Sequence, residues 1–499
     1  MNDLKKKGLL VSPTRRSLMS YALKGGVAAG FANMTIMKDL YAQSSGPIVI
    51  GHHAEITGGF ASWGHWHDIC AKKAVDLINA GGGIAKRKVE LVTEDTESNP
   101  AAGARKLRNL IQRANAEFVV GSVHSGVMLA SIPIATELKT IYFSQGEATE
   151  ATGSRGTRYS FRTGGDTYSL SAAGVPWALE NLGKKWSVIY ADYAWGQSHN
   201  AEAKAVVERL GGTYLKGIPV PLDAKDLVPY LTQVPADTEV LFSIFFGSLS
   251  VAFYTQAKSM GIDKRLKMYS VNGTMEAIDP DEIKGAAEGV YLIENFPRVS
   301  KYKADSFHQE FNKAMNIDDI YARERGGSRI MAKSHAWQSW EDMFALKQAI
   351  EASGYKSRKD VEGVIQALEG ANLKNSIGHP QGDKIIRKED HSGILDHYIS
   401  RIEKGRFEVK KRIPKEDLAK QLLAHPFQGQ HQFQLLEPEF HLLNVLQVRV
   451  GQLLKQLRIL QLQLARAHQQ LVHRLHRLCL ELCSHPSDER TVELARCGP

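Results

Sequence analysis

Cysteine is scarce in this chain and unevenly placed. Only four of the 499 residues are cysteines. Cys70 is the only one between residues 46 and 425, while Cys479, Cys483 and Cys497 lie near the C-terminus. No disulfide can therefore form within the central region. Cys70 falls on the apolar face of an expected helix, which favours a buried hydrophobic side chain over a reactive thiol.

Several other features are missing, and each absence excludes a class of protein. After the N-terminal region, no stretch reaches the run of about 18 apolar residues that predicts a membrane-spanning helix. The sequence has no GxxxxGK[ST] phosphate loop and no GxSxG nucleophile elbow. The net charge of +9 is compatible with an acidic partner or a membrane surface. However, no Lys/Arg run with interleaved aromatics occurs in the central region, so nucleic-acid binding is not expected.

The N-terminal residues 1–45 have the features of an export signal. Three lysines at 5–7 precede Arg15 and Arg16, a weakly apolar stretch covers 25–37, and small residues occur at 42–45. The Arg pair followed by Ser-Leu-Met resembles a twin-arginine signal. A general-secretion signal with two arginines by chance is the alternative. Either route predicts a periplasmic protein.

From Pro47 onward, apolar runs typical of strands alternate with helical patterns. The first series predicts strands at 47–52, 89–92, 118–123 and 141–144 and helices at 64–80, 101–113 and 127–138. The second predicts strands at 186–191, 213–220, 239–246 and 267–271 and helices at 198–210 and 249–260. A helix at 334–352 and a paired element at 397–411 complete them. This order predicts an α/β protein with two Rossmann-like lobes, each a parallel sheet covered by helices.

The tail, residues 421–499, differs in composition from the rest. It is rich in Gln, Leu, His and Arg, and its leucines recur at helical spacing. This pattern is typical of a basic amphipathic helix, which would act as a coiled-coil handle or lie on a membrane surface. The alternative is an adventitious extension translated in a shifted frame.

Several stretches together resemble a known family. They include TGGFASWG, FVVGSVHSGVMLASIPIATELKTIYFSQGEATEAT and WSVIYADYAWGQSHNAEAKAVVERLGG. Over residues 46–420 the chain resembles the extracytoplasmic solute-binding proteins of ABC transporters that bind leucine, isoleucine and valine. The resemblance implies the type I periplasmic binding fold, with a three-strand hinge between its lobes. Lobe 1 would comprise 46–163 and 298–395, and lobe 2 would comprise 164–297 and 396–420.

The same resemblance implies a function without catalysis. A small ligand would be trapped between the lobes and delivered to a membrane permease, with no cofactor, no metal and no partner nucleic acid. The protein would act as a monomer. A ligand-sensing protein of the same fold is the second reading. A hydrolase is the third, because Ser122, His124 and Ser125 lie close in sequence but have no orienting acid nearby.

The residues that follow the strands are candidates for the ligand site, because ligands of parallel sheets lie beyond the carboxyl ends of strands. The candidates are Trp63, Ser125, Ser144, Gly146, Glu147, Tyr193, Trp195, Phe246 and Asn272. Ser125 precedes a helix, where hydroxyl and N–H groups accept an anion. The aromatic residues are either cavity walls or core.

By the resemblance, Ser125 would hold an amino-acid carboxylate, with contacts from the turn 144–147. Asn272 stands near the position where amino-acid binders carry a glutamate for the ammonium. Glu147 and Glu276 are possible substitutes for that missing carboxylate. A buried ammonium without a counter-charge is unfavourable. We therefore expect a small carboxylate, amide or amino-acid-like ligand rather than a simple branched-chain amino acid.

Histidines are frequent near the loops of the first series. They are His52, His53, His65, His67 and His124. A metal site requires converging imidazoles. Because His65 and His67 are two residues apart, they do not share a helix face. Polar loop residues or ligand hydrogen bonds are the preferred interpretation.

Overall fold

The computed structural model describes residues 46–283, 285–297 and 306–424. The predicted export signal and the tail after residue 424 lie outside these ranges. None of the helices within them combines the length and the apolar character needed to cross a bilayer.

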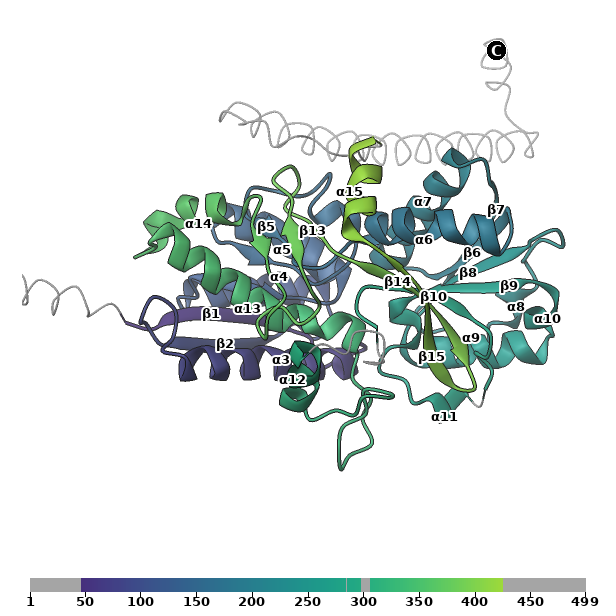
Figure 1. The fold of residues 1–499 in the computed structure, drawn as a ribbon, viewed down its shortest axis with the longest axis horizontal. Coiled ribbons are helices and arrows are strands. Elements are labelled where there is room, and N and C mark those ends of the chain that lie inside the picture. Colours follow the sequence, from purple (N-terminus) through teal and green to yellow (C-terminus); the bar gives the residue numbers. More distant parts are fainter. Residues whose placement is uncertain (1–45, 284, 298–305, 425–499) are drawn as a thin grey trace, which may run out of the picture. The chain divides into compact units, whose positions relative to one another are not determined.

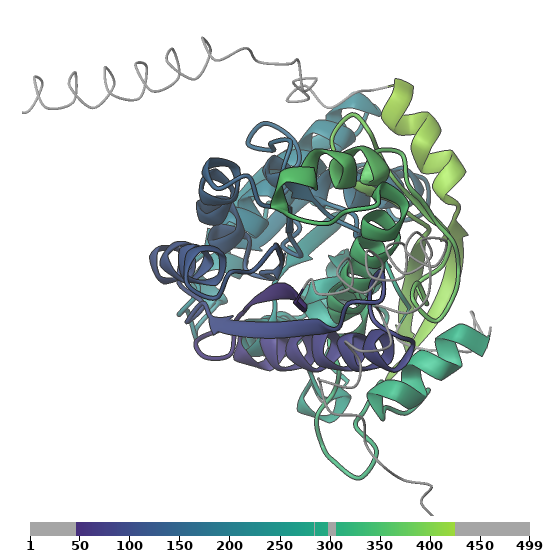
Figure 2. The same ribbon diagram turned by 90° about the vertical axis from the view of Figure 1, so that its left-hand side faces the viewer.

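The first sheet has five parallel strands in the order β2-β1-β3-β4-β5. The strands are β1 (Ile48–Ala54), β2 (Val89–Asp95), β3 (Phe118–Gly121), β4 (Tyr142–Phe143) and β5 (Ser160–Phe161). The helices that pack on this sheet or on one another are α3 (Ala61–Ala80), α4 (Pro100–Gln112), α5 (Ser125–Glu137), α12 (Ser306–Met315), α13 (Lys333–Ser353) and α14 (Val361–Leu368). Figure 2 shows α3, in purple, running alongside β1 and β2.

Both faces of this sheet are covered by helices, and its central strand β3 is apolar on both sides. Phe118 and Val120 of β3 pack into a core shared with α3 and α13. Val119, between them, packs into a separate core with α4 and α5. This division follows from the strand geometry, in which successive side chains point to opposite faces. Burial on both faces is what the continuous apolar run of β3 predicts.

The second sheet has seven strands in the order β15-β14-β10-β9-β8-β6-β7. The strands are β6 (Lys185–Ala191), β7 (Thr213–Val220), β8 (Val240–Ile244), β9 (Lys267–Val271), β10 (Tyr291–Glu294), β14 (His397–Glu403) and β15 (Arg406–Ile413). The helices between and after them are α6 (Thr167–Asn181), α7 (Ala194–Arg209), α8 (Val228–Leu231), α9 (Gly247–Ser259), α10 (Ile262–Arg265), α11 (Pro280–Ile283) and α15 (Lys415–Ala424). β14 and β15 pair antiparallel, whereas the other five strands are parallel.

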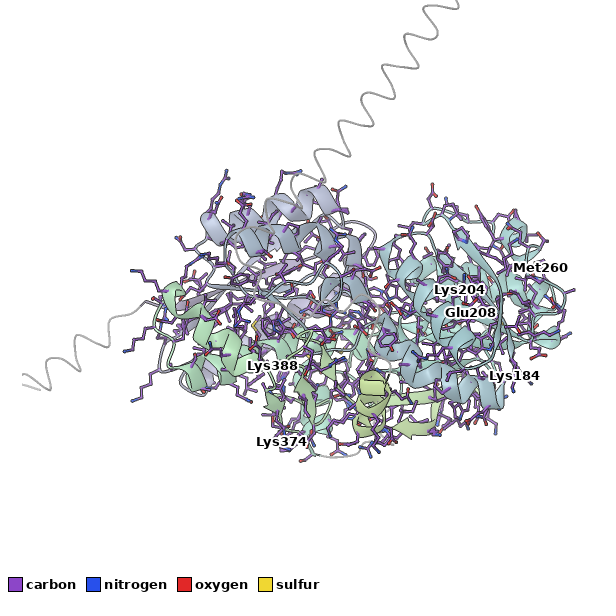
Figure 3. The ribbon with its side chains drawn as sticks, turned by 90° about the horizontal axis from the view of Figure 1, so that it is seen from above. Lys184, Lys204, Glu208, Met260, Lys374 and Lys388 are labelled. Atoms are coloured by element: carbon purple, nitrogen blue, oxygen red, sulfur yellow. The ribbon has the colours of Figure 1, made fainter. Side chains whose placement is uncertain are left out.

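The second sheet is also packed on both faces, and α7 has one buried and one exposed face. Val188 and Phe242 pack into the core with α6 and α7, while Ile189 and Leu241 face the opposite core with α9. Lys204 and Glu208, one turn apart on α7, both lie on the outer surface in Figure 3. The side of α7 that is turned to solvent therefore carries polar residues, as in a typical surface helix.

A third, small sheet is antiparallel and consists of β11 (Asn372–Leu373), β12 (Lys384–Ile386) and β13 (Gly393–Ile394). The chain passes from the first sheet to the second after β5, returns after β10, and enters the second sheet again at β14 (Figure 1). These three passages lie where the resemblance placed the hinge.

The predicted α/β fold with two parallel sheets is confirmed. The alternation left out β5, β10 and the small antiparallel sheet, and the helices α6, α8, α10, α11, α12, α14 and α15. α6 is buried on most sides, so it has no single apolar stripe for a periodicity argument to detect. β10 is only four residues long, too short for its pattern to differ from a buried loop.

Candidate functional site

A small cavity lies where the two sheets meet. Each sheet has a switch point, where strand order reverses: between β1 and β3 in the first, and between β6 and β8 in the second. Ligands of open α/β sheets bind at such points, beyond the carboxyl ends of the strands. The residues that line the cavity come from these ends and from the start of α13: Phe60, Trp63, Val123, Glu147, Tyr193, Trp195, Phe246 and His335. Both switch points therefore contribute to one site.

Five aromatic rings form most of the cavity wall. Phe60 and Phe246 stack with their ring centroids 4.5 Å apart, which joins the first sheet's loops to the second's. Trp63 and Trp195 each meet Phe246 edge-on, at 6.5 and 6.1 Å. The two indoles also converge over Gly273, because a Cβ built there would lie 2.9 Å from Trp195 and 3.4 Å from Trp63. We name these five rings, from Phe60, Trp63, Tyr193, Trp195 and Phe246, the aromatic box.

Glu147 is the acidic group in the wall, and its carboxylate is fully buried. It accepts hydrogen bonds from Trp195 Nε1 at 2.9 Å, from Asn272 Nδ2 at 2.9 Å and from Asn295 Nδ2 at 3.3 Å. Its oxygens lie 3.8 Å from a ring nitrogen of His199 and of His335. All three donors come from segments that follow strands of the second sheet, so this carboxylate, which follows β4 of the first sheet, links the two sheets.

The carboxylate is ionised at neutral pH. Burial alone would raise the pKa of Glu147, but His199, His335 and Asn272 outweigh it and lower the pKa to about 2. Burial lowers the pKa of the neighbouring His335, an effect only partly opposed by Glu147. Glu147 therefore provides a negative charge in the wall.

One polar group of the wall has no hydrogen-bond partner among the described residues. The side chain of Trp63 is 4% exposed, and its Nε1 is unpaired. A buried donor without a partner is unfavourable, and this indole lines the cavity. It is therefore available to a ligand.

A comparison with known protein families identifies the family to which this chain belongs. The family described as periplasmic binding protein matches residues 47–406, well over half of the chain. The chain belongs to the periplasmic binding protein family. The fold and the resemblance predicted from the sequence are confirmed.

Individual relatives support this assignment. The Leu/Ile/Val-binding protein homolog 8 of Brucella abortus (strain 2308) is 26% identical over 258 residues, which are 47% of this chain and 62% of that protein. The chain thus matches less than two thirds of this relative's length. It is a binding protein and not an enzyme, as the sequence predicted for this chain.

Solved structures show the same fold. A solute-binding protein from R. palustris in complex with benzoate is 19% identical with a TM-score of 0.64, over 74% of this chain and 97% of that one. A branched-chain amino acid transporter substrate-binding protein from Streptococcus pneumoniae in complex with isoleucine is 19% identical with a TM-score of 0.61, over 74% and 99%. At these identities the likeness shows the type I periplasmic binding fold alone.

In this family member, five of the nine predicted site residues line the cavity: Trp63, Glu147, Tyr193, Trp195 and Phe246. Asn272 lies behind the cavity wall, where it donates to Glu147. Glu147, one of the two possible substitutes for a carboxylate at this position, therefore lies next to Asn272.

The remaining three predicted residues do not line the cavity. Ser125 Oγ accepts a hydrogen bond from the backbone N–H of Ala148 at 3.3 Å, and Ser144 Oγ donates to the carbonyl of Phe161 at 3.4 Å. Gly146 packs against Ser125 and Met128. In this conformation the hydroxyls of both serines form hydrogen bonds with backbone groups near the first sheet.

The histidines have separate structural contacts. His53 Nε2 lies 2.8 Å from the carbonyl of Gly103, and His124 caps α5 by accepting from Gly126 and Val127 N–H. His67 lies 3.3 Å from His335. Among the described residues, no group of three His, Cys, Asp or Glu side chains is arranged to hold a metal ion.

Three lining residues were missed from the sequence: Phe60, Val123 and His335. Phe60 belongs to the same loop as Trp63, so its proximity was a usable signal. Val123 follows β3 at the switch point and is equally within reach of the strand-end argument. His335 lies at the start of α13, far along the chain from the other residues, and no local pattern marks it.

Outside the cavity, the buried Glu202 on α7 gives a pH-dependent stability. Burial, and to a smaller extent Asp166 and Glu150, raise its pKa to about 8. Between pH 4.5 and pH 8 the native state keeps this proton while the unfolded chain loses it, so stability falls as pH rises. Relative to wild type, we expect Glu202→Gln to gain about 2 kcal/mol between about pH 5.5 and about pH 7.5. Urea unfolding at both pH values measures it, and the exposed Glu180→Gln should show no such gain.

Proposed function

We propose that this protein is the extracytoplasmic receptor of an ABC importer, which binds a small ligand between its lobes and delivers it to a membrane permease. The observation that carries the proposal is the cavity formed jointly by the two switch points. A ligand that touches both sheets stabilises the closed arrangement, since it gains contacts that the open one lacks. No covalent chemistry is needed.

The lobe boundaries that we propose follow the three passages of the chain. Lobe 1 comprises 46–163 and 298–395, and lobe 2 comprises 164–297 and 396–420. The packing of α12 and α13 on α3 supports the first assignment. The pairing of β14 with β10 supports the second.

The ligand is small and carries hydrogen-bond donors. The eight lining side chains pack closely in this conformation, so little space is enclosed between them. An ionised Glu147 in the wall favours an amide or an amino-acid-like ligand over a simple carboxylate, because a carboxylate would be repelled. We propose that the protein acts as a monomer in the periplasm, exported by the segment 1–45, whose sequence predicts the twin-arginine route.

Titration calorimetry combined with solution scattering tests the proposal. We expect saturable binding of a small ligand, a decrease in the radius of gyration on binding, and recovery of the ligand unchanged. Leucine, isoleucine, valine and benzoate form the first panel. Chemical turnover of a bound ligand would contradict the receptor function, and tight binding of a branched-chain amino acid would contradict only the expected ligand class.

A further inference from the structure

We propose that the ligand of this cavity is a small organic cation whose alkylated ammonium group lies inside the aromatic box and faces Glu147. This inference rests on the proposed receptor function and specifies its ligand class.

The geometry of the rings carries the first part of the argument. Phe60 and Phe246 stack and cover one another's faces, whereas Trp63 and Trp195 stand edge-on to Phe246, which points to the two indoles as the faces that meet the cation. The face of an aromatic ring carries partial negative charge and attracts a cation within about 6 Å of its centroid. Alkylated ammonium groups are apolar on the outside and charged overall, so they suit a wall that is both apolar and π-rich. Tryptophan, which supplies two of the five rings, is the strongest of the aromatic side chains in this interaction.

The charge balance carries the second part. None of the eight lining residues is Lys or Arg, and Glu147 is the only one with a carboxylate. Its hydrogen-bond partners Trp195, Asn272 and Asn295 are neutral. The imidazole nitrogens of His199 and His335 lie 3.8 Å from its oxygens, which is longer than a direct hydrogen bond, and a buried charge is stabilised by a partner of opposite sign in direct contact. A cationic ligand supplies that partner.

The buried Arg162 does not take this role. Its Nη2 donates to the carbonyl of Ala148 at 3.0 Å. Its charge interacts with Asp166 and Asp390 before Glu147. The guanidinium therefore interacts more strongly with acids outside the cavity than with Glu147.

The two competing ligand classes fit less well. An aromatic acid would stack on the rings but bring its carboxylate towards Glu147, with no cation in the wall to receive it. A neutral aliphatic ligand would fill the box but leave the charge of Glu147 uncompensated. Only a cation uses both the rings and the carboxylate.

Calorimetry with a matched pair of probes tests the inference. Choline and 3,3-dimethylbutan-1-ol have the same shape but differ in charge, and tetramethylammonium is the minimal cation. We expect choline to bind about 10- to 100-fold more tightly than its neutral isostere. Equal or weaker binding of choline and tetramethylammonium than of the isostere overturns the inference. Tight, closure-inducing binding of benzoate or leucine in their place overturns it as well, but leaves the receptor function standing.

Variants locate the effect. In Glu147→Gln we expect the preference for choline over the neutral isostere to fall by about 10-fold or more, because the amide carries no charge. Glu202→Gln, an equally conservative change at another buried glutamate, should keep the wild-type preference. Trp63→Phe should weaken choline more than the isostere. An unchanged preference in both Glu147→Gln and Trp63→Phe would contradict the proposed pose, and the wild-type comparison stands whether or not a variant folds.

Discussion

Replacing Lys384 with methionine is expected to lower the free energy of unfolding by about 3–5 kcal/mol. Lys384 on β12 and Glu341 on α13 form an ion pair in which both side chains are fully buried. The ammonium also lies 4.1 Å from the ring centroid of Trp337. Burial alone would raise the pKa of Glu341, but Lys384 and His379 outweigh it, so the carboxylate is ionised. Methionine removes the ammonium and leaves this charge buried. Urea denaturation at pH 7 measures the loss.

Two further variants make this prediction specific. Lys374 follows β11 in the same small sheet and pairs with Asp383, but its side chain is 68% exposed and lies on the periphery in Figure 3. Lys374→Met should therefore change stability by less than about 1 kcal/mol. Adding Glu341→Gln to Lys384→Met should restore part of the loss, because the unpaired charge is then removed. A loss at Lys384 no larger than at Lys374 would show that the buried pair contributes no more than a surface pair.

Replacing Gly64 with alanine is expected to destabilise the protein by about 3 kcal/mol. Gly64 lies in the first turns of α3, and a Cβ built there would come within 1.9 Å of the carbonyl oxygen of Glu55. Neither group can yield easily, since both are backbone-borne and buried. The helix start would have to move away from the end of β1, and it carries Phe60 and Trp63 of the aromatic box. Chemical denaturation measures the stability.

Gly59 is the matched control in the same loop. A Cβ at Gly59 would meet nothing within 4 Å, and its backbone is outside the left-handed region. Gly59→Ala should leave stability unchanged or raise it slightly, through the lower entropy of the unfolded chain. Equal stability of the two alanine variants would show that the close approach at Gly64 imposes no constraint.

The parts of the site that the sequence predicted share one physical basis. Trp63, Tyr193, Trp195 and Phe246 follow strands, and the carboxyl ends of parallel strands meet at one edge. Once the strands are recognised from their apolar runs, these positions follow without knowledge of the tertiary packing. The boundaries of β9, expected at 267–271, agree with the structure for the same reason.

The parts that were not predicted depend on contacts between distant segments. From the sequence, the hydroxyl of Ser125 was expected to bind a ligand. In the structure the turn after β4 folds back, and the N–H of Ala148 donates a hydrogen bond to this hydroxyl oxygen. His335 enters the cavity only because α13 packs on α3. Of the two possible substitutes for a carboxylate at Asn272, Glu147 lines the cavity and accepts from Asn272, whereas Glu276 accepts from the N–H of Ser334. Local patterns cannot distinguish these two glutamates.

The placement of the tryptophans has an optical consequence. Two of the seven tryptophans, Trp63 and Trp195, line the cavity, and the others lie at positions 66, 177, 186, 337 and 340. The emission of these two indoles depends on whether water or a ligand lies against them. The intrinsic tryptophan fluorescence of the unlabelled protein should therefore report ligand binding. Stopped-flow measurements of this fluorescence can give the rates of ligand association and dissociation without an attached dye.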